Sequence, residues 1–346
     1  MSKKQRQSNI ELLRIIAMFL VLLVHADFFS LGTPTANDIQ QEPLDAFFRI
    51  FFESISIICV NVFVLISGWF GIKPTAKGLC NFIFQCIFFL TGLYLVTLII
   101  GTSKLSLEGI AGCFFATRLN WFIKAYLLLY ILSPVLNAFI TTASRHIYKW
   151  VLTGFFLFTC SYGWTGAAGF MQDGYTTLFF IGLYLLARYI RTYSPQFSLY
   201  KPRVYLFLYI GCAIFVTITS FICPLIITKL YSYLSPTTII GALALLLFFT
   251  KINLQNKFVN WCGISCFAVF LMHVSPSTLW HFKSQFVYLH ENLSIPNFWI
   301  ATFIILTLVF IFSILVDKIR IKIWDYTYKM IEPTLNRFFS DDTDKK

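Results

Sequence analysis

The sequence has little charge for its length. Only 12% of its 346 residues are Asp, Glu, Lys or Arg, whereas soluble domains carry about 25% charged residues. At the same time, 58% of the residues are apolar. A soluble core does not absorb so much apolar surface, so the composition excludes an ordinary soluble domain and favours a chain whose helices lie in a bilayer.

The sequence also lacks the patterns of a metal or disulfide site. Its nine cysteines lie mostly within apolar runs, without a Cys-x-x-Cys pair and without a His at metal-ligand spacing. We therefore interpret them as small buried hydrophobic residues and expect no metal. The net charge of +12 forms no single basic patch, because Lys and Arg are spread between the apolar runs. This spread argues against a nucleic-acid partner.

The apolar residues fall into ten runs, and roughly 20 apolar residues suffice to cross a bilayer as a helix. The runs are residues 10–30, 47–70, 79–101, 120–140, 147–164, 174–190, 203–227, 233–250, 261–280 and 297–316. The sequence thus predicts an all-α polytopic membrane protein with about ten transmembrane helices. We expect a tail over residues 1–9, a transmembrane domain over residues 10–316, and a tail over residues 317–346 that suits a helix at the membrane surface.

Basic residues mark alternate loops, which sets the predicted orientation. One set of loops, including both tails, is rich in basic residues: Lys3, Lys4, Arg6, Lys73, Lys77, Arg145, Lys149, Arg188, Arg191, Lys201, Arg203, Lys251, Lys257 and the segment 318–346. The other set holds only Arg49, Lys104, Arg118, Lys229 and Lys283. By the positive-inside rule, both termini are cytoplasmic. No small-residue cleavage site follows the first apolar run, which favours a first span over a signal peptide.

The first predicted span contains two ionisable side chains, Arg14 and His25. Eleven helical positions separate them, which is three turns plus about 20°, so both project from one face about 16 Å apart. Glu11 lies three positions before Arg14 and can pair with it. Taken singly, Arg14 can snorkel to the headgroups and His25 can be a hydrogen-bonded structural histidine. Together they predict a site that holds an anionic ligand and transfers a proton.

Four segments resemble the membrane-bound acyltransferase-3 family. The stretch from Asn9 to His25 has an acidic residue three before an Arg, an Ala three after it, and a His eleven after it. Residues 61–69 resemble the end of the family's second span, and residues 120–134 its Trp-Phe…Tyr…Pro span. Residues 265–273 resemble its late helix that ends in His. The resemblance covers nearly the whole chain.

The resemblance implies transfer of an acyl group, usually acetyl, from cytoplasmic acetyl-CoA or another short acyl-CoA. The implied acceptor is a hydroxyl of a cell-envelope polysaccharide or lipid-linked glycan, and the implied location is the cytoplasmic membrane. By this analogy, His25 is the catalytic residue and Arg14 helps to hold the CoA phosphates. The chemistry agrees, because a hydroxyl is a poor nucleophile unless a base takes its proton, and Arg suits phosphate. Where some members carry Arg-x-x-Arg, this chain has Lys73 and Lys77 at similar spacing, and by the same analogy we expect these two lysines to contact CoA.

Further polar and aromatic residues are candidates for the wall of the site. They are Glu53, Asn61, Ser67, Trp121, Lys124, Tyr130, Asp173 and His273. We expect Glu53 to pair with Arg49 one turn earlier. For these residues, packing of polar groups between helices is the alternative interpretation.

Two other functions remain open from the sequence. In a transporter or flippase of glycolipid or polysaccharide, Arg14 and His25 would line a translocation path instead of a reaction centre. A structural partner of a polysaccharide-export complex has only the general hydrophobicity in its favour. Consumption of acetyl-CoA separates the enzyme from both.

Overall fold

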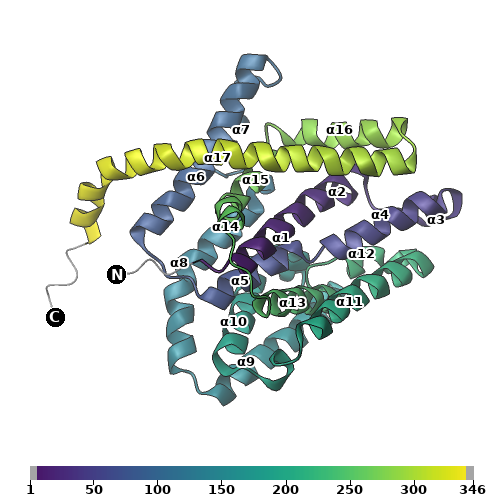
Figure 1. The fold of residues 1–346 in the computed structure, drawn as a ribbon, viewed down its shortest axis with the longest axis horizontal. Coiled ribbons are helices and arrows are strands. Elements are labelled where there is room, and N and C mark those ends of the chain that lie inside the picture. Colours follow the sequence, from purple (N-terminus) through teal and green to yellow (C-terminus); the bar gives the residue numbers. More distant parts are fainter. Residues whose placement is uncertain (1–5, 340–346) are drawn as a thin grey trace.

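The computed structural model describes residues 6–339, with side chains as far as residue 334, and every regular element in that part is a helix (Figure 1). Lys3, Lys4 and the end of the predicted C-terminal tail lie outside the described residues. The α-helices are α1 (Ser8–Ala26), α2 (Phe28–Leu31), α3 (Ala36–Gln41), α4 (Pro43–Ser56), α5 (Cys59–Phe70), α6 (Ala76–Ile100), α7 (Leu107–Cys113), α8 (Trp121–Thr142), α9 (Arg145–Phe158), α10 (Thr177–Tyr193), α11 (Pro202–Ile222), α12 (Ile227–Leu230), α13 (Pro236–Thr250), α14 (Lys257–Gly263), α15 (Cys266–His273), α16 (Leu279–Asn292) and α17 (Ile295–Phe339). Short helices of other types are η1 (Arg118–Asn120), η2 (Thr159–Gly163), η3 (Gly169–Gly174), η4 (Gln196–Ser198) and η5 (Pro224–Ile226).

Six helical stretches of the described chain are long and apolar enough to cross a membrane: Ser8–Leu31, Pro43–Phe70, Ala76–Ile100, Leu107–Thr142, Pro202–Ile222 and Ile295–Thr334. The predicted all-α membrane fold is thus confirmed, while the count of ten and the side of the termini stay predictions. The other predicted runs correspond to shorter helices, such as α13 with 15 residues. At 1.5 Å per residue such a helix rises only about 22 Å, which is less than a bilayer core of about 30 Å.

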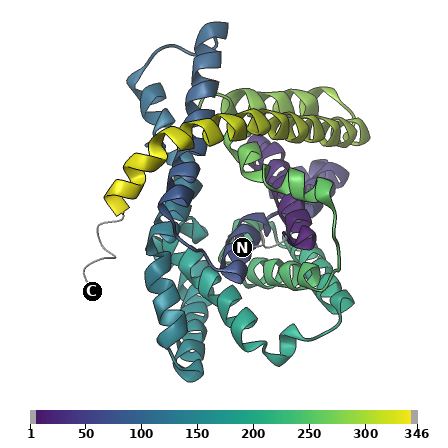
Figure 2. The same ribbon diagram turned by 60° about the vertical axis from the view of Figure 1, so that its left-hand side comes forward.

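Helix α1 lies inside the bundle. It contacts α4, α5, α13, α14, α15, α16 and α17, and Figures 1 and 2 show it between α17 on one side and α13 on the other. Leu13, Ala17 and Leu22 of α1 are fully buried. The polar side chains of this helix are therefore surrounded by protein, where they need partners or a cavity.

A close approach of α5 and α10 positions one end of the site. Gly68 makes this approach possible, because a Cβ atom added there would lie 2.9 Å from the Cα of Tyr184. Small residues allow membrane helices to pack with their backbones close together. The last residues of α5 are thereby held against α10.

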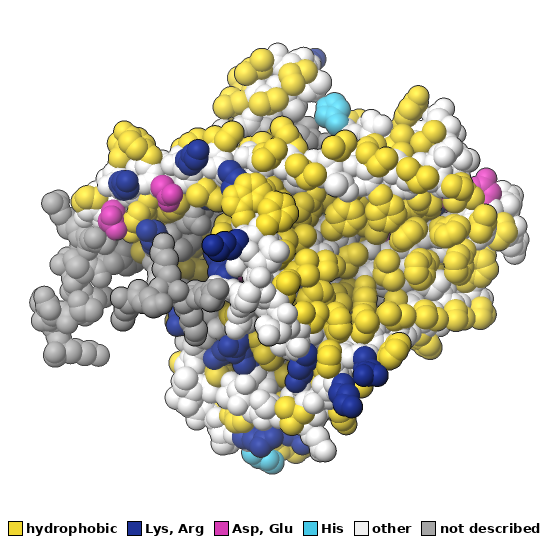
Figure 3. All heavy atoms as spheres, viewed as in Figure 1, with side chains coloured by type: hydrophobic (Ala, Val, Ile, Leu, Met, Phe, Trp, Pro, Cys, Tyr) yellow, Lys and Arg dark blue, Asp and Glu magenta, His cyan; other side chains and the backbone are white. Residues whose placement is uncertain are grey.

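The outer surface is that of a membrane protein. Large apolar side chains such as Ile99 and Leu225 are 85% and 93% exposed. In the space-filling view, yellow hydrophobic side chains cover much of the right-hand part of the face, and dark blue Lys and Arg side chains lie toward its left and lower parts (Figure 3). This separation suits a lipid-facing belt with a basic side, as the charge pattern predicts.

Helix α17 continues without a break past residue 316, where we expect the transmembrane domain to end. Buried polar contacts hold the chain here. Arg320 pairs with Asp317 at 2.8 Å and donates to Asn81 of α6, and Gln85 of α6 donates to Asp317. Position 317 thus lies within one helix that is tied to α6, and the surface location of the later residues stays a prediction.

Candidate active site

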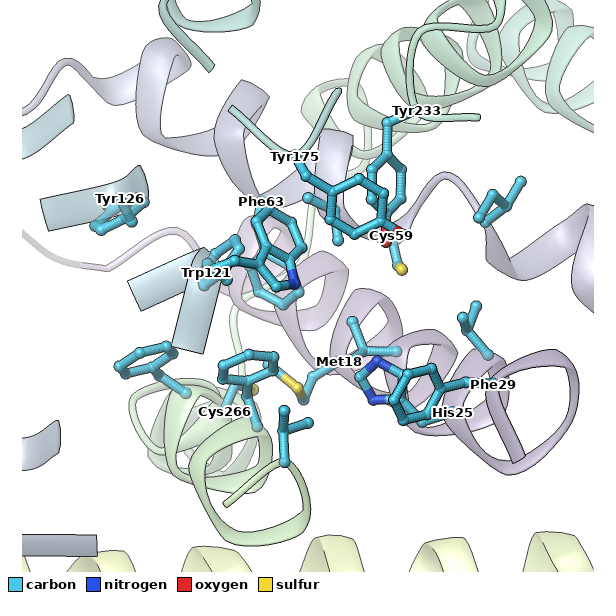
Figure 4. Close-up of a pocket in the computed structure, with 18 of the residues that line it drawn as sticks. Met18, His25, Phe29, Cys59, Phe63, Trp121, Tyr126, Tyr175, Tyr233 and Cys266 are labelled. Atoms are coloured by element: carbon cyan, nitrogen blue, oxygen red, sulfur yellow. The ribbon is translucent and has the colours of Figure 1, made fainter. Parts of the chain in front are cut away.

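A cavity of about 710 Å³ follows α1 from Arg14 to His25. Its lining includes Arg6 and Arg14 toward the start of α1, then His25, and then Thr33 beyond α2. The predicted single face for Arg14 and His25 is thus confirmed, because both side chains line the same cavity. Figure 4 shows His25 and Phe29 on one side of the cavity and Trp121, Tyr175 and Tyr233 on the other.

His25 and His273 form a hydrogen-bonded pair. The Nδ1 of His25 lies 2.8 Å from the Nε2 of His273, and the Nδ1 of His273 lies 2.6 Å from the carbonyl oxygen of Val269. A carbonyl only accepts, so we assign the proton of His273 to Nδ1. Its Nε2 then accepts from the Nδ1–H of His25. The neutral pair therefore leaves Nε2 of His25 with a free lone pair.

The two histidines differ in exposure. His273 is 3% exposed and is enclosed by Phe270 and Phe282, whereas His25 is half-buried and lines the cavity. The partner of His25 is thus held within the protein core, and His25 itself meets whatever enters the cavity. A histidine oriented by a second acceptor is the arrangement expected of a general base.

The other end of α1 is basic. Arg14 donates to Glu11 at 2.6 Å, which confirms the predicted pair, and Arg6 donates to the same carboxylate oxygen at 3.1 Å. Glu11 is 4% exposed and packs against Gly263, where a Cβ atom would collide with its carboxylate. Two guanidinium groups thus share one carboxylate, which leaves positive charge at this end of the cavity.

The predicted pair between Arg49 and Glu53 is wrong. Arg49 instead donates to Asp27 at 2.7 Å and to the carbonyl oxygen of Gly32, because the end of α1 brings Asp27 against α4. Glu53 is 3% exposed and lines the cavity, and its Oε2 has no hydrogen-bond partner among the described residues. A buried carboxylate without a partner is costly, so Glu53 is available to a ligand.

Three aromatic rings form the wall near the far end of the cavity. Trp121 lies 4.5 Å from Tyr175 and 6.2 Å from Tyr233, measured between ring centroids. Tyr175 and Tyr233 are 5.0 Å apart. The two tyrosines come from connections before α10 and α13, and sequence reasoning missed them because no local pattern indicates that these connections meet.

The family model described as an acyltransferase domain, that of acyltransferase-3, matches residues 7–317. The chain belongs to the acyltransferase-3 family. No curated protein and no solved structure matches the chain. The family match and the long apolar helices together identify the protein as a multi-pass membrane acyltransferase. The matched domain contains Arg14, His25 and His273.

In this acyltransferase, two of the other predicted residues line the cavity and two hold the fold. Ser67 and Trp121 line it, and Ser67 shares a hydrogen bond of 3.0 Å with Tyr126. Asn61 is buried and donates to the carbonyl oxygen of Tyr233, which fixes the backbone of the aromatic wall. The hydroxyl of Tyr130 accepts from the backbone N–H of Thr75 and donates to its carbonyl oxygen.

The remaining predicted residues lie away from the cavity lining of the acyltransferase. Lys124 donates to the carbonyl oxygen of Thr117, and Asp173 lies in η3, where its carbonyl oxygen accepts from Ser232. Lys73 is exposed, and the ammonium group of Lys77 lies 3.9 Å from the ring centroid of Tyr328 in α17. No cluster of three or more His, Cys, Asp or Glu residues suited to a metal occurs in residues 6–339.

Proposed function

We propose that this membrane acyltransferase moves an acetyl or another short acyl group from cytoplasmic acyl-CoA to a hydroxyl of a cell-envelope polysaccharide or lipid-linked glycan. One observation carries the proposal. The hydrogen-bonded chain from Val269 through His273 to His25 ends on a cavity that extends along α1 to Arg14. His25, the proposed base, and Arg14, the cation proposed to bind phosphate, thus line one cavity.

His25 acts as the general base in the proposed reaction. Its Nε2 takes the proton of the acceptor hydroxyl while the hydroxyl oxygen forms a bond to the thioester carbonyl carbon. The carbon–sulfur bond then breaks, and the CoA sulfur leaves with the proton that His25 holds. The products are an ester and free CoA, and His25 returns to its neutral form. His273 stabilises the intermediate imidazolium, because its Nε2 accepts from His25 throughout.

The donor extends from His25 toward Arg14. Eleven residues of helix separate these two residues, a rise of about 16 Å. With the thioester at His25, the pantetheine arm follows the cavity along α1, and the phosphates come to the level of Arg14. A guanidinium group binds phosphate through two parallel hydrogen bonds, and Glu11 orients the guanidinium of Arg14.

The acceptor occupies the far end of the cavity. Rings such as Trp121, Tyr175 and Tyr233 offer flat apolar faces with polar tips, and Glu53 offers an unpartnered carboxylate oxygen. A sugar presents both apolar ring faces and hydroxyl donors, so this combination suits a glycan. Arg118 and Thr228 also line the cavity, and both lie in or beside segments predicted to be outside the cytoplasm. We therefore expect the acceptor to arrive from the side opposite to the donor.

Reconstituted protein tests the proposal. Purified protein in nanodiscs receives radiolabelled acetyl-CoA together with membranes from a strain that lacks this gene as the acceptor source. We expect label in the glycan fraction and release of free CoA thiol with the wild type, and neither with His25→Ala. His281→Ala, a control at an exposed histidine, should behave as the wild type does. Glycan movement across the membrane without any thioester consumption would instead identify a transporter.

A further inference from the structure

Three arginine side chains from two helices surround the end of α5. The Cζ of Arg191 lies 5.2 Å from the ring centroid of Trp69 and 5.4 Å from that of Phe70. Arg14 approaches the same Phe70 ring from α1, at 5.9 Å. Phe70 is therefore close to both a cation of the cavity lining and a cation of α10.

Arg188 lies one turn before Arg191 and reaches the backbone just after α5. Gly71 has a φ of +76°, and a Cβ atom built there would lie 3.1 Å from the Nη1 of Arg188. Only glycine adopts this backbone conformation without strain and also leaves room for the guanidinium group. The turn after α5 thus holds Arg188 beside the two aromatic rings.

Arg188 and Arg191 have no carboxylate partner in the described part of the chain. Arg188 is half-buried, and its Nε is buried without a hydrogen-bond acceptor. Other arginines that enter the protein are paired, as Arg49 is with Asp27 and Arg320 with Asp317. Two like charges one helical turn apart repel each other, and a buried donor without an acceptor is unfavourable. An anionic ligand would reduce the repulsion between the two arginines and would give the buried donor of Arg188 an acceptor.

From this arrangement we infer that Arg188 and Arg191 bind phosphate of the nucleotide end of acyl-CoA, and that Trp69 and Phe70 offer the aromatic faces for its base. The inference rests on the proposed function. If the thioester is at His25 and the arm runs along α1, the nucleotide lies at or beyond the level of Arg14. Arg14 and Arg191 both lie near the Phe70 ring, so Arg188 and Arg191 are close to the Arg14 end of the cavity, where the proposed donor path leads.

The chemistry of the site fits a nucleotide with several phosphates. Each guanidinium presents a planar fork to two phosphate oxygens, and Arg14 alone, with its charge shared with Glu11, serves one group. Phe70 is 38% exposed, so its ring is accessible for stacking. An anionic lipid headgroup carries the same phosphate chemistry, and the membrane composition in the experiment separates the two sources.

The test compares two donors. Equilibrium binding of acetyl-CoA and of acetyl-pantetheine, which lacks the nucleotide, is measured for wild type and for Arg188→Gln/Arg191→Gln in phosphatidylcholine nanodiscs without anionic lipid. Loss of a charge-assisted contact weakens binding about tenfold to a hundredfold for each arginine. We expect this loss for acetyl-CoA and no loss for acetyl-pantetheine. Arg203→Gln, an exposed arginine of α11, is the matched control and should bind both donors as the wild type does.

A second variant distinguishes loss of phosphate contacts from misfolding. Arg188→Lys/Arg191→Lys keeps the charges and loses the forks, so it should fall between wild type and the Gln variant for acetyl-CoA. Equal weakening for both donors would assign the arginines a structural role and overturn the inference. Unchanged acetyl-CoA affinity without anionic lipid would overturn it in favour of a headgroup site. Failure of the wild type to bind acetyl-CoA at all would instead refute the proposed function.

Discussion

The hydrogen bond between His25 and His273 gives a prediction with a definite size. In the transition state His25 carries a positive charge, and Nε2 of His273 is its acceptor at 2.8 Å. A hydrogen bond to a charged group contributes about 1.5–3 kcal/mol, and each 1.36 kcal/mol is tenfold in rate. His273→Leu should therefore lower kcat about 10- to 150-fold. His273 makes no contact with the donor path, so KM for acetyl-CoA should change little.

The conservative variant distinguishes positioning from packing. His273→Gln can place its carboxamide oxygen near the position of Nε2, so it keeps an acceptor for His25 and should recover activity to within about tenfold of wild type. Initial rates of CoA thiol release, with thermal melting of each variant in detergent, provide the measurement. Equal losses for Leu and Gln, or a rise in KM as large as the fall in kcat, would refute the role assigned to His273.

Three further predictions concern the donor, the topology and the packing. Arg14→Ala should weaken acetyl-CoA binding markedly, and Arg14→Lys should restore it only in part because the planar fork is lost; unchanged binding in both variants would leave snorkelling as the better account. In a background without the native cysteines, cysteine at exposed Asn37 or Glu291 should react with an impermeant thiol reagent from outside, and cysteine at exposed Lys73 or Gln196 should not; the opposite labelling would reverse the orientation. Gly68→Ala should destabilise the protein by about 1–3 kcal/mol through overpacking, while Gly92→Ala, which has open space around it, should not; equal melting temperatures would contradict the close packing of α5 on α10.

The part of the site that lies on one helix could be predicted from the sequence. Helical geometry alone places Arg14 and His25 on a common face and Glu11 within reach of Arg14, and the structure shows both relations. The same reasoning failed for Arg49. Its predicted partner Glu53 lies on the same helix, but the observed partner is Asp27, in the turn between α1 and α2. Periodicity describes neighbours within an element and says nothing of neighbours between elements.

Residues that come together from distant connections could not be predicted. Tyr175, Tyr233, Arg188 and Arg191 have no local signal that separates them from other aromatic or basic residues at membrane edges. The unpartnered state of Arg188 becomes visible only when its surroundings are known. The count of spans is limited for a similar reason, because an apolar run such as residues 233–250 reads alike whether it crosses the bilayer or forms a short helix inside the protein.

The central claim is that His25 takes the proton of an acceptor hydroxyl during acyl transfer. The most direct measurement is the acyl content of the surface glycan, by mass spectrometry, in cells with wild type, His25→Ala or His25→Gln at matched membrane levels. A general base contributes about 10²- to 10⁴-fold to a rate, and Gln has a similar reach but accepts no proton at this step. We predict that both variants bind acetyl-CoA and leave the glycan almost without acyl groups. Full acylation with His25→Gln would contradict the claim.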